Sequence, residues 1–282
     1  MSEEKERIRN REQLVDEMRN YSLFNDSFMS VALNDKLACQ YVLRILSGIP
    51  DLVVKEIRTQ YRVSQVTAHD AVLDVLAEDS TGRLYNLEVQ RADTIDHARR
   101  TRFYGAVVDS EYLAKGADYY ELPDVYIIYI SETDLWRAGC SVYPVVKCFE
   151  NTGIIYDDGL HILYVNAAVN DGTEIASLMQ YFKTADPDDM RFGALSERVH
   201  YLKREEGGYS EMNDVLKRSF EEGREEGREE GREEGREEGR ILQLREISIR
   251  LKEQGYSEAE IAELLAIDTD HVHVLLSDPV VV

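Results

Sequence analysis

Residues 70–91 read DAVLDVLAE (Asp70–Glu78), DSTG (Asp79–Gly82) and RLYNLEVQR (Arg83–Arg91). The outer segments are rich in Val and Leu and alternate these with polar residues, a pattern typical of β-strands. The middle segment consists of residues that favour turns. The sequence therefore predicts a β-hairpin whose turn is centred on Thr81.

Asp74 and Glu88 are equally far from this turn centre, so they face each other across the predicted hairpin. Opposed residues of an antiparallel pair share a face, with Cβ atoms about 5 Å apart. Gln90 stands two positions after Glu88 and points the same way. These three polar side chains, together with Asn86, are therefore expected on one face.

The other face of the hairpin is the predicted core side. It carries Ala71, Leu73, Val75, Ala77, Leu87 and Val89, whereas the polar face adds only Val72, Leu76 and Leu84. Two facing carboxylates repel each other unless a cation lies between them. Such oxygen ligands suit Mg²⁺ or Mn²⁺. A merely solvated sheet face is the alternative interpretation, and the spacing alone leaves both open.

The elements around the hairpin indicate an α/β domain. A helix is expected over residues 26–46 because its apolar residues recur at helical spacing and Gly48 and Pro50 follow. The other expected strands cover residues 52–63, 125–131, 142–149 and 161–166, and the other expected helices cover residues 95–115, 173–183 and 188–203. This order predicts a hairpin-containing sheet flanked by helices.

Composition supports a buried core, since 43% of the 282 residues are hydrophobic and 31% are charged. No apolar run reaches the roughly 18 residues that span a bilayer. The N-terminal sequence lacks the pattern of a secretory signal, so a cytoplasmic location is expected. Cys39, Cys140 and Cys148 are too few and too scattered to predict a disulfide framework or a zinc site.

The formal net charge of −22 is unfavourable for a protein that binds nucleic acid, because Lys and Arg normally neutralise the phosphates. Residues 221–240 are five copies of Glu-Glu-Gly-Arg, whose ten Glu and five Arg account for −5 of this charge. The four-residue period places like charges at i,i+4, and each Gly costs about 1 kcal/mol in a helix. We expect a marginal helix that acts as a solvated spacer, with an interaction arm as the alternative.

A helical tail follows the repeat. An amphipathic helix is expected over residues 241–254, Ser257 to Glu260 form a capping box before a short helix, and Thr269 begins a last helix. The arrangement is similar to a helix-turn-helix, but residues 257–282 contain six acidic residues and no Lys or Arg. A protein-contact module is therefore favoured over a DNA reader, with homodimerisation as one use.

Four regions result from this pattern. They are a charged N-terminal arm (1–21), an α/β domain (22–205), a linker with the repeats (206–240) and a small helical tail module (241–282).

Asp74, followed after thirteen residues by Glu88-Val89-Gln90, resembles the D…(D/E)xK core of PD-(D/E)XK nucleases, with Gln90 in the lysine position. More narrowly, the chain resembles the Rpn family of recombination-promoting nucleases and transposases over roughly residues 22–205. The matching segments are Asn25–Met29, Leu73–Val75, Tyr85–Asp93, Arg99–Tyr104, Leu122–Ile130 and Tyr164–Asn166. Members of this family also often end in an acidic-basic-glycine repeat and a short helical tail.

The resemblance implies a restriction-endonuclease-like fold, a mixed sheet flanked by helices, that cuts DNA with Mg²⁺ (Mn²⁺ or Ca²⁺ as alternatives) in recombination, transposition or defence against foreign DNA. Asp74, Glu88 and Gln90 would be catalytic. Asp74, Glu88 and the backbone carbonyl of Val89 would bind the metal, and Asp26 is the candidate for a further acidic ligand. Gln90 departs from the motif, because an amide orients water but supplies no cation.

A basic cluster follows the predicted site along the chain: Arg91, Arg99, Arg100 and Arg102. Arg91, Arg99 and Arg102 are the candidate contacts to DNA phosphates, and salt bridges to nearby carboxylates are the alternative interpretation. Tyr104 is expected in the core.

Two other functions stay open. The first is a degenerate family member that binds DNA or protein without cutting, which Gln90 and the acidic charge favour. The second is an adaptor that acts through its repeat and tail. The adaptor would be favoured if another element covered the face of Asp74 and Glu88.

Overall fold

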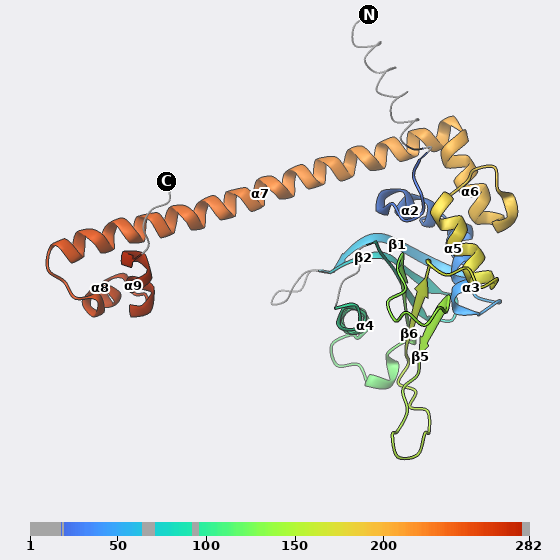
Figure 1. Ribbon diagram of the computed structural model, residues 1–282, viewed down its shortest axis with the longest axis horizontal. Helices are drawn as coiled ribbons and strands as arrows, with labels where there is room; N and C mark the ends of the chain where they lie inside the picture. Colours follow the sequence, from blue (N-terminus) through green and yellow to red (C-terminus); the bar gives the residue numbers. More distant parts are fainter. Residues whose placement is uncertain (1–17, 19, 64–70, 92–95, 278–282) are drawn as a thin grey trace, which may run out of the picture. The chain divides into compact units, whose positions relative to one another are not determined.

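The computed structural model describes residue 18 and residues 20–63, 71–91 and 96–277. A six-stranded mixed sheet lies at the centre of the first part of the chain (Figure 1). Its strands, in the spatial order β1-β2-β3-β4-β6-β5, are β1 (Val54–Val63), β2 (Ala71–Asp79), β3 (Leu84–Gln90), β4 (Val125–Ser131), β6 (Leu160–Asn166) and β5 (Val142–Val145). Strands β1 to β3 form an antiparallel meander, β3, β4 and β6 are parallel, and β5 is antiparallel to β6.

The hairpin of β2 and β3 has the predicted register, because Val75 pairs with Leu87 and Ala77 with Tyr85. The buried Asp79 carboxylate stabilises the turn by accepting hydrogen bonds from the backbone N–H groups of Thr81 and Arg83 at 2.8 and 3.0 Å. Such local side-chain-to-backbone bonds are characteristic of Asp in turns.

Helices cover both faces of the sheet (Figure 1). On one face lie α2 (Asp26–Leu33), α3 (Lys36–Ser47), α5 (Glu174–Thr184) and α6 (Gly193–Arg204), and their buried side chains join the larger hydrophobic cluster. Helix α4 (His97–Tyr112) covers the other face and packs Tyr104, Val107 and Val108 into a second cluster. Short 3-10 turns occur at Tyr119–Glu121 and Met190–Phe192.

The predicted core face of the hairpin is confirmed for Val75, Ala77, Leu87 and Val89, which lie in or against the larger cluster. The opposite face is buried as well, because Leu76 and Leu84 pack under α4. Leu73 was expected beside Val75 but lies in the second cluster, whereas Val75 lies in the first. Gln60 of β1 has φ +49, which L-residues rarely adopt. It lies between Thr59 and Tyr61, the partners of Val75 and Leu73, and at this point the side chains of β2 change from one face of the sheet to the other.

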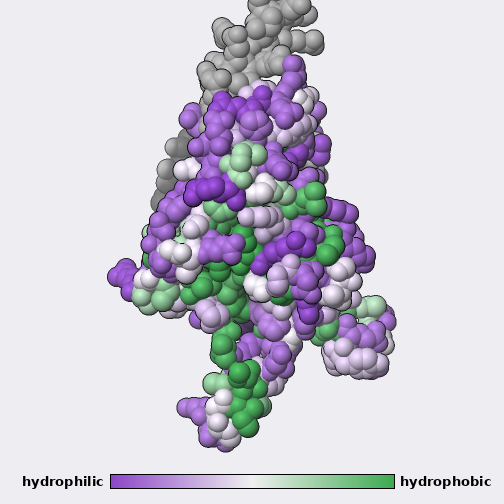
Figure 2. All heavy atoms as spheres, turned by 90° about the vertical axis from the view of Figure 1, so that its right-hand side faces the viewer, coloured by the Kyte–Doolittle hydropathy of each residue, from purple (hydrophilic) through white to green (hydrophobic). Residues whose placement is uncertain are grey.

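The helix expected over residues 26–46 is two helices. The Asp35 side chain accepts hydrogen bonds from the backbone N–H groups of Leu37 and Ala38, so it caps a new helix and separates α3 from α2. Strand β5 also ends at Val145 rather than at residue 149. Residues 146–156 instead form a projecting loop that exposes Val146, Phe149, Ile154, Ile155 and Tyr156 (Figure 2).

The chain divides into two compact units, residues 1–216 and 217–282. Helix α7 (Glu206–Glu253) belongs to both and includes the repeat, which was expected to form only a marginal helix. The reason is cooperativity: the turns before the repeat pack Met212 into the core, so the repeat extends an existing helix and needs no nucleation of its own.

In the second unit, the end of α7 packs with α8 (Glu258–Leu265) and α9 (Thr269–Ser277) around Ile261, Ala262 and Val272. The expected capping box is present, with Ser257 and Glu260 bonded reciprocally. The protein-contact role of these helices, dimerisation included, stays a prediction. The predicted N-terminal arm falls mostly outside the described residues. Across the described ranges, no helix has both the length and the apolarity needed to cross a membrane.

We predict that a chain ending at Leu216 unfolds at the same temperature as the full-length protein, because the core clusters of the first unit lie before this residue. Thermal unfolding followed by circular dichroism measures this. As a control, Met212→Ala in the shortened chain should lower stability by about 2–5 kcal/mol, since Met212 is fully buried. A large loss of melting temperature on truncation alone would show that the second unit stabilises the first.

Candidate active site

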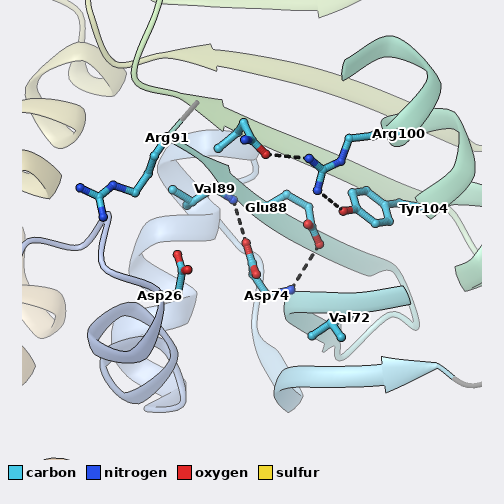
Figure 3. Close-up of a pocket in the computed structure, with 9 residues that line it drawn as sticks. Asp26, Val72, Asp74, Glu88, Val89, Arg91, Arg100 and Tyr104 are labelled. Atoms are coloured by element: carbon cyan, nitrogen blue, oxygen red, sulfur yellow. Dashed lines mark hydrogen bonds between the residues drawn. The ribbon is translucent and has the colours of Figure 1, made fainter. Parts of the chain in front are cut away.

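A pocket of about 320 Å³ opens beside the ends of β2 and β3 that lie away from their turn (Figure 3). It is lined by Asp26, Val72, Asp74, Glu88, Val89, Gln90, Arg91, Arg100 and Tyr104. The structure thus brings together both strand carboxylates, Gln90, Asp26 and Arg91, as the sequence predicts. Strands β2 and β3 and helices α2 and α4 supply the lining, so the site depends on the hairpin and on helices from both faces of the sheet.

Two crossed hydrogen bonds hold the strand carboxylates in place. The Asp74 carboxylate accepts a hydrogen bond from the backbone N–H of Val89 at 2.9 Å. The Glu88 carboxylate accepts one from the backbone N–H of Asp74 at 3.3 Å. Regular pairing of the two strands ends at Val75 and Leu87, so these side-chain bonds replace ladder bonds where the strands part (Figure 3). Each carboxylate is therefore fixed by the backbone of the opposite strand.

Glu88 is buried, with 4% of its surface exposed. Burial, and to a lesser degree the nearby Asp74 carboxylate, raise the pKa of Glu88 to about 8, against the lowering effect of the hydrogen bond from the Asp74 backbone. A carboxyl group with this pKa is largely protonated at neutral pH. A cation in the pocket would reverse this by stabilising the charged form.

Burial also raises the pKa of Asp74, to about 6, against the hydrogen bond from Val89 that lowers it. Charge repulsion from Asp26 contributes to this rise in the pKa of Asp74, and both carboxylates line the pocket. Figure 3 shows Asp26 at the start of α2, next to Asp74 in the pocket. Asn25 begins α2 by accepting a hydrogen bond from the Phe28 N–H, and this cap sets the direction in which Asp26 enters the site.

Arg100 is the pocket residue that sequence reasoning did not select. Its guanidinium donates to the side-chain oxygen of Gln90 at 2.8 Å and to the hydroxyl of Tyr104 at 2.9 Å (Figure 3). Tyr104 is buried, as expected for a core residue, but its hydroxyl also faces the site. A signal was present in the sequence, because Arg100 precedes Tyr104 by one helical turn and so lies on the face of α4 that meets the sheet.

The other predicted phosphate contacts lie at different places. Arg91 lines the pocket, is exposed, and approaches Glu132 at 3.9 Å. Arg99 and Arg102 are exposed on α4 and do not belong to the pocket lining. Contact of these three arginines with DNA stays a prediction.

The pocket fits a hydrated divalent cation better than a closed metal cage. Within the ranges that the structure describes, no three or more His, Cys, Asp or Glu side chains are grouped so that they could hold a metal ion. Mg²⁺ in proteins is usually bound by one or two carboxylates and keeps several waters. Half-buried Asp74 and buried Glu88, adjacent carboxylates with raised pKa values, are the donor set that such an ion would stabilise.

Comparison with known families matches residues 34–199, more than half of the chain, to the PD-(D/E)XK nuclease family transposases. The chain belongs to this family. No curated protein and no solved structure was found to match it.

Membership explains the architecture of the site. The mixed sheet with flanking helices is the restriction-endonuclease-like PD-(D/E)XK fold, followed here by a helical C-terminal region. The family assignment covers both strand carboxylates, Gln90 and α4, and it indicates a nuclease-type function.

We predict that the metal-free protein loses stability as the pH rises from 4.5, the ordinary pKa of Glu88, through about 8, its value in the fold. The sign follows from linkage: the folded state holds a proton that the unfolded state releases, so this stability is complete at low pH and disappears above the raised pKa. The expected loss is on the order of a few kcal/mol. Melting temperatures in EDTA across this range measure it.

Glu88→Gln should flatten this dependence, because the amide does not titrate. Glu78→Gln is the matched control on β2, since Glu78 forms an ion pair with Lys55 outside the pocket and should leave the slope unchanged. Mg²⁺ should raise the melting temperature more at the upper end of the range than at the lower. A wild-type protein with the same slope as Glu88→Gln would contradict the prediction.

Proposed function

We propose that this protein is a metal-dependent endonuclease that hydrolyses phosphodiester bonds in DNA. The observation that carries the proposal is the fixed pair of half-buried Asp74 and buried Glu88 that lines a pocket. Two such carboxylates side by side are costly unless a cation stabilises them. Recombination, transposition and defence against foreign DNA are the processes in which such an activity would serve.

Asp74 and Glu88 would bind the metal directly, and the Val89 carbonyl and Asp26 would add ligands from the pocket wall. Mg²⁺ or Mn²⁺ held there would lower the pKa of bound water and neutralise charge on the phosphate. The crossed backbone hydrogen bonds keep the two carboxylates in position before DNA arrives. Little reorganisation is then needed when the phosphate enters the site.

Arg100 would supply the positive charge that Gln90 lacks. In the family motif a lysine occupies the Gln90 position, and here the Gln90 amide oxygen accepts a hydrogen bond from the Arg100 guanidinium. The guanidinium of Arg100 on α4 therefore lies in direct contact with the residue at the lysine position of the motif. Gln90 would position Arg100 and orient water, and Arg100 would stabilise the negative charge that develops on the phosphate.

An adaptor role would be favoured by a covered carboxylate face. Helix α4 does cover Leu76 and Leu84 on this face, but Asp74 and Glu88 line an open pocket. The arrangement thus supports catalysis over a purely structural use of the domain.

We expect purified protein to nick supercoiled plasmid with Mg²⁺ or Mn²⁺ and not in EDTA. Asp74→Asn and Glu88→Gln should each lower the nicking rate by at least about a hundredfold, since even changes to residues behind metal ligands cost about 10–100-fold. Glu78→Gln should cut normally, because it lies on the same strand outside the pocket. Nicking that survives both carboxylate changes would disprove the assignment, and a complete lack of nicking by wild-type protein would favour the degenerate-member alternative.

Arg100→Gln should reduce the nicking rate at saturating DNA by about a hundredfold, the cost of removing one donor to developing charge. Arg99→Gln and Arg102→Gln are controls on the same helix, and they should weaken DNA binding without changing the rate at saturation. Single-turnover nicking at increasing protein concentration separates the two effects. If Arg100→Gln behaves like its two neighbours, Arg100 contributes to affinity alone.

A further inference from the structure

The chain's only tryptophan, Trp136, lies in the loop between β4 and β5 and exposes 44% of its surface. Its ring packs against three others: Tyr164 at 4.4 Å, His97 at 4.9 Å and Tyr143 at 5.4 Å between centroids. One part of the indole is thus held by aromatic rings while another part faces solvent.

The loop that carries Trp136 is firmly tied down. The Asp134 carboxylate accepts hydrogen bonds from the backbone N–H groups of Arg137 and Gly139 and from the hydroxyl of Tyr143 at 3.0, 2.9 and 2.6 Å. Tyr143 therefore both packs against the indole and anchors the loop beneath it. An exposed aromatic ring that is already fixed loses little conformational entropy when a ligand stacks on it.

Trp136 also stands on the same side of the sheet as the pocket. Glu88, Tyr129 and Tyr164 form a row across three neighbouring parallel strands. Strands lie about 4.8 Å apart, so Tyr164 is about 10 Å from Glu88 along this row. Helix α4 spans both ends, because its residue Thr101 hydrogen-bonds Tyr164 at 2.8 Å and its residue Arg100 hydrogen-bonds Gln90.

We propose that Trp136 is a stacking platform for an unpaired nucleobase of a DNA strand whose backbone runs through the pocket. The proposal rests on the nuclease function proposed above and specifies its substrate as DNA with a single-stranded or melted segment. Tyr164, on which the indole packs, is about 10 Å from Glu88, a separation that a few nucleotides of one strand can span. Bases inside a duplex have their faces covered by neighbours, so an indole face selects bases that are unstacked.

The charge of the protein favours this mode of recognition. The net charge of −22 disfavours binding to phosphates, whereas stacking gains affinity from contact with the neutral base. Exposed Arg137 follows Trp136 directly and can approach a phosphate of the stacked nucleotide. The nearby Asp134 carboxylate is occupied by the hydrogen bonds that it accepts within the loop and from Tyr143.

The experiment uses full-length protein in EDTA, where no cleavage is expected. Because Trp136 is the only tryptophan, its fluorescence reports stacking directly. We expect saturable quenching by a short oligodeoxythymidylate and much less quenching by a blunt duplex of equal length. By anisotropy of the labelled single strand, Trp136→Leu should bind at least about fivefold more weakly, the lower end of what one base stack contributes.

Trp136→Phe keeps an aromatic face and should retain most of the affinity. Tyr120→Leu is the matched control, since Tyr120 is 84% exposed in the 3-10 turn Tyr119–Glu121 and its loss should change nothing. The fluorescence titration needs no variant, so a folding defect in Trp136→Leu does not block the test. Binding seen by anisotropy without quenching overturns the platform, and so does the absence of single-strand binding.

Plasmid nicking with Mg²⁺ is measured in parallel and separates the two proposals. Normal nicking together with an unresponsive Trp136 rejects the platform and leaves the nuclease intact. Quenching by single strands together with no nicking rejects the nuclease and leaves a single-strand binding site.

Discussion

The reciprocal hydrogen bonding between β2 and β3 is the interaction on which the site depends. A buried carboxylate needs a donor, and in the middle of a sheet the backbone donors are already used by the ladder. Here the ladder ends at the pair Val75–Leu87, next to Asp74 and Glu88. The N–H groups of Asp74 and Val89 are then free to donate to the carboxylate of the opposite strand. The same parting of the strands opens the pocket, so one local departure from regular pairing creates both the ligands and the space they line.

The hairpin and its carboxylates could be predicted from the sequence because turn chemistry and alternation are local properties. The register follows from the turn centre, and the structure has it. Leu73 was misplaced because alternation does not encode the change of face between Leu73 and Val75, which coincides with the positive φ of Gln60 on the neighbouring strand. Arg100 was overlooked because its role depends on which face of α4 packs against the sheet. Three neighbouring arginines look alike in sequence, and only packing distinguishes the one whose guanidinium reaches Gln90.

The helicity of the repeat, residues 221–240, also depends on more than its own sequence. Its unfavourable like-charge spacing and glycines predict weak helicity, yet α7 passes through it because the helix is already formed on both sides. A period of four residues also advances by about 40° per repeat around a helix of 3.6 residues per turn. A glycine stripe with this drift cannot stay in contact with one straight partner. A Cβ added at Gly231, Gly235 or Gly239 would meet no atom within 4 Å, which agrees with a solvated spacer.

The negative charge of the chain disfavours DNA binding unless a divalent cation is present in the pocket. Among the residues that the structure describes, Asp26, Asp74 and Glu88 line the pocket together with two cations, Arg91 and Arg100, and Arg91 already approaches Glu132. A phosphate entering this pocket without a metal would meet either like charges or protonated carboxyls, given the raised pKa values of Asp74 and Glu88. A divalent cation changes both conditions at once, because it ionises the carboxyls and leaves positive charge for the phosphate. Under the proposed function, metal binding therefore has to precede or accompany productive binding of the scissile phosphate, while stacking on Trp136 does not require the metal.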